Sequence, residues 1–147
     1  KLQVLFLQQT LAKLKRMQKN KIPKYLLETD ILIDYLTFNN IGSEPFLLNL
    51  MQKGICFTSV LNASELFMAA KTDYEKEKVR DLLNAINVLG LHARYSLAVS
   101  DCKNNFNNIS DVLFYVLAEQ NKLTIVSLNS DKYSGLKVNS IHPKLIE

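Results

Sequence analysis

Length and composition predict one small domain. The chain has 147 residues, 48% of them hydrophobic, so it can bury a core without disulfides or metal ions to hold it together. No apolar run approaches the ~20 residues of a membrane span, and the apolar stretch from Leu2 to Leu7 lacks a small-residue cleavage site. We therefore expect neither a membrane helix nor a secretory signal.

The net charge of +4 comes from one end of the chain. Residues 1–24 hold seven bases and no acid, whereas in residues 25–147 the other 11 bases face 14 acids, so that region carries about −3. This division predicts a basic extension at 1–24 and a separate domain at 25–147. Cys56 and Cys102 form no CxxC or Cys/His cluster, which favours reduced thiols and a cytoplasmic protein.

The extension has the pattern of an amphipathic helix, because apolar residues recur at steps of three and four. These residues are Val4, Leu7, Leu11, Leu14 and Met17. Two interpretations stay open. The helix presents a basic face to RNA or fits a partner's groove, or it packs on the domain or on a subunit with its lysines merely solvated.

Beyond Pro23, apolar strands alternate with helical patterns. Buried strands are predicted at 25–27, 55–59 and 123–127, and two short strands are expected after Gly90 and at 136–138. Helices are predicted at 31–36, 44–53, 62–70, 73–88, 94–102 and 111–120, the last capped by Ser110. This alternation predicts an α/β fold with a parallel sheet covered by helices on both faces.

Acidic side chains recur where such a sheet places its sites, beyond the carboxyl ends of the strands. Glu28 directly follows the first strand, Glu65 lies one turn into the helix after the second, and Asp111 begins the helix that leads into the third. Asn129 and Asp131 follow the third strand. Carboxylates brought together repel one another, and a bound Mg²⁺ or Mn²⁺ relieves that repulsion, so a divalent metal site is predicted.

Three segments resemble the motifs of PIN domains, in particular VapC-type toxins. The segment 25–36 (YLLETDILIDYL) resembles the first motif, 58–67 (TSVLNASELF) the second, and 109–129 the third with its following strand. The matches come in family order with family spacing over about residues 25–139. The resemblance implies a three-layer α/β/α domain with a short parallel sheet, and the N-terminal helix lies outside it.

Two positions depart from the family pattern. The first aspartate of the family falls on Glu28, which is one methylene longer, with Asp30 two residues on. The fourth position, often acidic, falls on Asn129, and Asp131 is displaced from it by two residues. A natural variant, a weakened metal affinity and an inactivating substitution are all compatible with these departures.

The resemblance implies a Mg²⁺- or Mn²⁺-dependent endoribonuclease, the toxin of a type II toxin–antitoxin pair. The metal would be held chiefly by Glu28 and Asp111, with Glu65 as a ligand directly or through water, and Asp131 is either a substitute ligand or a loop residue. Ser127 and Asn129 would position water or a phosphate, with Asp30 as an auxiliary acid. The family also implies a homodimer and a cognate antitoxin as partner. Candidate RNA-binding bases are Lys13, Arg16, Arg94 and Lys132.

Other classes lack the residues they require. The four glycines of the chain form neither a Walker A loop nor a dinucleotide-binding fingerprint. A response-regulator receiver domain would need a lysine just after a late strand, but Leu128 and Asn129 follow the predicted strand 123–127. No histidine has the spacing of a hydrolase triad. The remaining rival is a catalytically inactive PIN-like module that binds RNA or protein, which would not need to bind metal.

Overall fold

The computed structural model describes residues 2–19 and 21–147, and the side chains of residues 14–19 and 103 lie outside this description. The strands are β1 (Lys24–Leu27), β2 (Ile55–Ser59), β3 (Asn87–Leu89), β4 (Thr124–Val126) and β5 (Ser140–Ile141). The helices are α1 (Leu2–Lys19), α2 (Thr29–Thr37), α3 (Phe46–Lys53), α4 (Val60–Ala69), α5 (Asp73–Ala85), α6 (Tyr95–Cys102) and α7 (Ile109–Asn121). Short 3-10 turns are η1 (Lys103–Asn105), η2 (Ser130–Tyr133) and η3 (Pro143–Leu145).

The strands form one parallel sheet in the order β3-β2-β1-β4-β5. β1 lies at the centre, where Leu26 is opposite Phe57 of β2 and Ile125 of β4. The chain builds the sheet outward from β1 through β2 and β3, then crosses to the other side of β1 for β4 and β5. This reversal leaves a crevice beyond the carboxyl ends of β1 and β4, which is where open α/β sheets bind their ligands.

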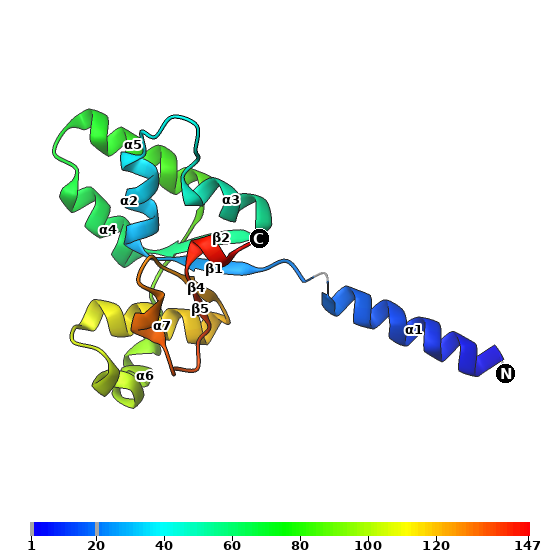
Figure 1. Ribbon diagram of the computed structural model, residues 1–147. Coiled ribbons are helices and arrows are strands. Elements are labelled where there is room, and N and C mark those ends of the chain that lie inside the picture. Colours follow the sequence, from blue (N-terminus) through cyan, green and yellow to red (C-terminus); the bar gives the residue numbers. More distant parts are fainter. Residues whose placement is uncertain (1, 20) are drawn as a thin grey trace.

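Helices cover both faces of the sheet (Figure 1). Because successive side chains of a strand point to opposite faces, Leu26 and Ile125 pack with α7 on one side. Leu27 and Val126 pack on the other side with apolar residues of α2, α3, α4 and α5. The predicted three-layer arrangement is confirmed.

Local chemistry explains several element boundaries. Ser59 caps α4 and Thr72 caps α5, each in a capping box that satisfies helix N–H groups. Gly54 ends α3 where the chain passes close to β1, since a Cβ there would lie 2.5 Å from the carbonyl oxygen of Pro23 and 2.7 Å from the ring of Tyr25. Both cysteines are free and buried.

Four details of the predicted elements are wrong. The strand expected after Gly90 lies before it, at Asn87–Leu89, and for that reason α5 ends at Ala85 instead of continuing to 88. The last strand is Ser140–Ile141 and not 136–138. The cap of α7 is Asn108 and not Ser110, because the side chain of Asn108 accepts a hydrogen bond from the backbone N–H of Asp111.

Helix α1 extends away from the α/β domain (Figure 1). Its described apolar side chains face solvent; Leu2 is 84% exposed and Phe6 69%. The described part of α1 is therefore not packed on the domain of its own chain. Among the residues that the structure describes, no helix combines the length and apolar character needed to cross a membrane.

Candidate metal centre

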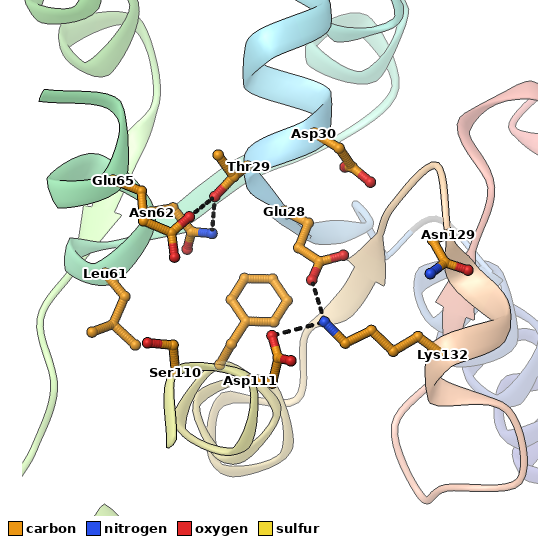
Figure 2. A pocket seen from close by; sticks show the side chains of 11 residues that line it. Glu28, Thr29, Asp30, Leu61, Asn62, Glu65, Ser110, Asp111, Asn129 and Lys132 are labelled. Atoms are coloured by element: carbon orange, nitrogen blue, oxygen red, sulfur yellow. Dashed lines mark hydrogen bonds and ion pairs between the residues drawn. The ribbon is translucent and has the colours of Figure 1, made fainter. Parts of the chain in front are cut away.

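A pocket of about 240 Å³ lies beyond the carboxyl ends of β1 and β4. Its walls come from the β1–α2 junction, the first turns of α4 and α7, and the loop after β4 (Figure 2). The polar side chains that line it are Glu28, Thr29, Asp30, Asn62, Glu65, Ser110, Asp111, Asn129 and Lys132. The topology thus brings together acids that lie up to 83 residues apart in the sequence.

Glu28 stands at the junction of β1 and α2, where it is the N-cap residue of α2. Its backbone N–H donates to the carbonyl of Val126 at 3.1 Å, which continues the pairing of β1 with β4 by one residue. Its carboxylate accepts a hydrogen bond at Oε1 from the hydroxyl of Tyr133, 2.6 Å away. Tyr133 is buried, and burial together with the charge of Glu28 raises the pKa of its phenol, so it acts as a fixed donor.

Asp111 occupies the first turn of α7 and is held by the residue that caps this helix. Asn108 accepts from the backbone N–H of Asp111 at 2.9 Å and donates from Nδ2 to Asp111 Oδ2 at 2.8 Å. These two bonds aim the carboxylate across the pocket toward Glu28, as Figure 2 shows.

Lys132 reaches between these two carboxylates from η2. Its ammonium lies 2.7 Å from Asp111 Oδ1 and 3.3 Å from Glu28 Oε1. Burial lowers the pKa of Lys132, but its hydrogen bonds and the charges of Asp111 and Glu28 outweigh burial, so the pKa is raised above its usual value. A cation thus links Glu28 and Asp111, two of the acids that the sequence analysis names as candidate metal ligands.

Glu65 lies on the opposite wall of the pocket and is exposed. Its Oε2 accepts from the hydroxyl of Thr29 at 2.7 Å, and Thr29 accepts in turn from Asn62 Nδ2 at 2.8 Å. Asn62 is itself fixed by the capping box with Ser59. This chain of hydrogen bonds turns Glu65 toward α2 and away from the pair formed by Glu28 and Asp111 (Figure 2).

Asp30 and Ser127 brace the loop after β4. Asp30 Oδ2 accepts from the hydroxyl of Ser127 at 2.9 Å and from the backbone N–H of Leu128 at 3.0 Å. Burial raises the pKa of Asp30 above its usual value, although the bond from Ser127 opposes this. The other oxygen, Oδ1, is buried and has no hydrogen-bond partner among the described residues.

The remaining predicted residues lie at the rim or elsewhere. Asn129 lines the pocket but is exposed, whereas Asp131 is exposed and does not line it. Lys13 and Arg94 are exposed and lie outside this pocket. Arg16 belongs to α1, but its side chain lies outside the described residues.

The oxygen chemistry of the pocket fits a hard divalent cation. Mg²⁺ is commonly held by one or two carboxylates and keeps several waters, and Glu28 and Asp111 provide two that approach a common point. In the described part of the chain, no group of three or more His, Cys, Asp or Glu side chains is placed to hold a metal. The pocket therefore fits a metal held by two carboxylates and several waters. The ammonium of Lys132 lies at the point where Glu28 and Asp111 approach each other.

Two important residues of this centre escaped the sequence reasoning. Tyr133 carries no local signal, since a tyrosine in a loop becomes a donor to Glu28 only through the fold. Asn108 had a signal, because Asn is as good an N-cap residue as Ser and stands three residues before Asp111.

The fold and the site define a class of protein: a parallel α/β domain with an acidic pocket at the crevice of its sheet. The PIN domain family model matches residues 25–135, so the chain belongs to the PIN domain family. A comparison with curated proteins found no match.

Solved structures with the same fold come from toxin–antitoxin complexes. The chain is similar to VapBC2 from Rickettsia felis bound to promoter DNA, with a TM-score of 0.69, 15% identity and coverage of 81% of this chain and 98% of that one. For VapBC-1 from nontypeable Haemophilus influenzae the TM-score is 0.68 at 12% identity, with coverage of 82% of this chain and 98% of that one. For a toxin–antitoxin complex from Klebsiella pneumoniae the TM-score is 0.67 at 16% identity, with coverage of 81% of this chain and 97% of that one. At these identities the likeness concerns the fold.

Proposed function

We propose that this protein is a metal-dependent endoribonuclease, the toxin of a type II toxin–antitoxin pair. PIN domains are generally nucleases, and the observation that carries the proposal is the convergence of Glu28 and Asp111 on one point of the sheet crevice. Both fall at motif positions that the resemblance to VapC-type toxins assigns to the metal, although the first of these is an aspartate in the family pattern.

Glu28 and Asp111 would hold Mg²⁺ or Mn²⁺, with Glu65 as a ligand through water. When bound, the metal lowers the pKa of a coordinated water and offsets charge on the phosphoryl oxygens of RNA. Tyr133 and Asn108 keep the two carboxylates in place. Asn129, which lines the exposed rim, would orient water or a phosphate, and Asp30 with Ser127 supports the loop that carries it.

The partners follow from the same proposal. The structural neighbours are toxin–antitoxin complexes, which supports an antitoxin as the partner that silences this chain. We further propose that the protein forms a homodimer and is located in the cytoplasm. Residues 25–147 would form the nuclease domain, with residues 1–24 as a basic extension.

A second candidate is an inactive PIN-like module that binds RNA or protein. The specific observation in its favour is the ion pairing of Lys132, which neutralises part of the acid pair, together with the neutral Asn129 at the family's fourth position. The two functions differ in metal binding, since only the enzyme requires a divalent ion.

Asp111→Asn tests the proposed nuclease. We expect this variant to lose cleavage of a structured RNA in the presence of Mn²⁺ and to lose Mn²⁺ binding by calorimetry, because an amide oxygen carries no charge for the metal. Asn retains the size of Asp and the backbone contact with Asn108. Asp101→Asn is the matched control, since Asp101 is an exposed acid on α6 outside the pocket.

Cleavage by the wild type and by Asp101→Asn, but not by Asp111→Asn, supports the nuclease. Undiminished cleavage by a folded Asp111→Asn protein refutes the metal site. A folded wild type that neither binds Mn²⁺ nor cleaves RNA leaves the inactive module as the better description.

A further inference from the structure

The position of Lys132 carries a consequence for the metal centre. Its ammonium contacts one oxygen of each carboxylate, Asp111 Oδ1 at 2.7 Å and Glu28 Oε1 at 3.3 Å (Figure 2). The three side chains come from three separate places in the chain, the junction of β1 and α2, the start of α7, and η2. They are partly sheltered, with side-chain exposures of 16% for Glu28, 24% for Asp111 and 29% for Lys132.

An ammonium and a divalent ion compete for such a place. Both are attracted by the same two negative charges, and each would use the same carboxylate oxygens. Two cations within a few ångströms of each other also repel, most strongly where water is partly excluded. Occupation by Lys132 and occupation by a metal are therefore mutually exclusive at this point.

The lysine is built so that it can leave without unfolding the site. Its neighbour Tyr133 is buried and hydrogen-bonded to Glu28, which anchors η2. The Lys132 side chain has a flexible four-carbon stem, and its exposed part faces solvent, so a change of rotamers moves the ammonium outward. The backbone and Tyr133 need not move.

We propose that Lys132 is an internal competitor of the divalent metal. In the metal-free protein its ammonium bridges Glu28 and Asp111, and it must swing out before Mg²⁺ or Mn²⁺ binds. This inference rests on the proposed metal-dependent function and adds a closed state to it. The apparent metal affinity is the intrinsic affinity reduced by the fraction of molecules in which Lys132 is displaced.

The test compares Mn²⁺ binding by Lys132→Met with the wild type in calorimetry. Met keeps the length and apolar stem of Lys but has no charge, so we expect tighter binding, by about tenfold if Lys132 is displaced in about one molecule in ten of the wild type. Lys132→Arg retains the positive charge and should bind no tighter than the wild type. Lys24→Met is the matched control, since Lys24 is exposed at the opposite end of β1 and its loss changes the net charge equally.

Thermal denaturation gives a second readout that does not depend on cleavage. Without metal, Lys132→Met leaves two facing carboxylates without their counter-ion, so its Tm should fall below that of the wild type. Saturating Mn²⁺ should raise the Tm of Lys132→Met more than that of the wild type. Lys24→Met should respond to Mn²⁺ as the wild type does.

The outcomes separate this inference from the proposed function. If the wild type binds Mn²⁺ and cleaves RNA while folded Lys132→Met binds no more tightly, the competition is refuted and the nuclease stands. If only Lys132→Met binds Mn²⁺, the competition is supported and activity of the natural chain is refuted. If neither binds Mn²⁺, both proposals fall.

Discussion

Tyr133 shows how a neutral residue shapes a charged centre. Its hydroxyl donates to Glu28 Oε1, the same oxygen that Lys132 contacts. The ring packs against Phe106 and Phe114, so the donor is fixed by the core and not by the loop. Glu28 is thereby kept in one orientation even though its side chain is longer than the aspartate of the family pattern.

Tyr133→Phe should destabilise the fold and loosen Glu28. We expect the free energy of unfolding to fall by about 1.5–3 kcal/mol, because a hydrogen bond to a charged group is lost while the ring stays in place. Urea denaturation measures this change, and Tyr74→Phe is the control, since Tyr74 is 71% exposed. A stability of Tyr133→Phe equal to that of the wild type would mean that the bond to Glu28 contributes nothing.

The position of Glu28 and Asp111 beyond the strand ends was predictable from the sequence, whereas their contacts with Lys132 and Tyr133 were not. Glu28 and Asp111 could be placed because each adjoins a recognisable apolar strand or helix start. Lys132 lies 104 positions from Glu28 in the sequence and belongs to a polar loop, so sequence reasoning assigned it to RNA binding. Its contact with both acids depends on the pairing of β1 with β4 in the sheet, which local sequence patterns do not contain.

At the scale of elements, one side chain at the start of α7 both caps the helix and positions a carboxylate of the site. Asn108 caps the helix through Oδ1 and fixes the carboxylate of Asp111 through Nδ2. Ser110 lies inside the first turn and lines the pocket without capping the helix.

Asn108→Ala and Ser110→Ala should therefore differ in stability. Loss of the cap costs about 1 kcal/mol in the free energy of unfolding, whereas truncation of Ser110 should change it by less than about 0.5 kcal/mol. Chemical denaturation of both variants checks this difference. A larger loss of unfolding free energy for Ser110→Ala than for Asn108→Ala would mean that Ser110, as predicted from the sequence, is the cap of α7.

The strands that were predicted and those that were missed differ in burial. β1, β2 and β4 lie in the middle of the sheet, so their sequences are largely apolar, and this pattern predicts a buried strand. β3 and β5 are edge strands of three and two residues with mostly exposed or half-buried side chains. Such strands exist because a neighbouring strand offers hydrogen bonds, and their own residues carry no pattern.

At the scale of the whole molecule, charge is divided between two parts. Residues 25–147 contain all 14 acids of the chain, four of which line the pocket, yet the proposed substrate is a polyanion. Helix α1 carries bases without acids and extends from the domain with its described apolar side chains exposed (Figure 1). The exposure of its described side chains argues against packing on its own domain, which leaves contact with RNA, with a partner or with a second subunit.

If α1 supplies the basic face, neutralising Lys13 and Arg16 should weaken RNA binding. We expect Lys13→Gln/Arg16→Gln, in the non-cleaving Asp111→Asn background, to bind RNA less tightly and to lower the slope of log K against log salt by about one to two, because each phosphate contact releases a counterion. Fluorescence anisotropy over a range of salt concentrations measures both quantities. Lys71→Gln/Lys144→Gln removes two exposed domain lysines and controls for net charge. Equal slopes for the two double variants would show that α1 contributes only general charge, and the extension would then have to serve a partner other than RNA.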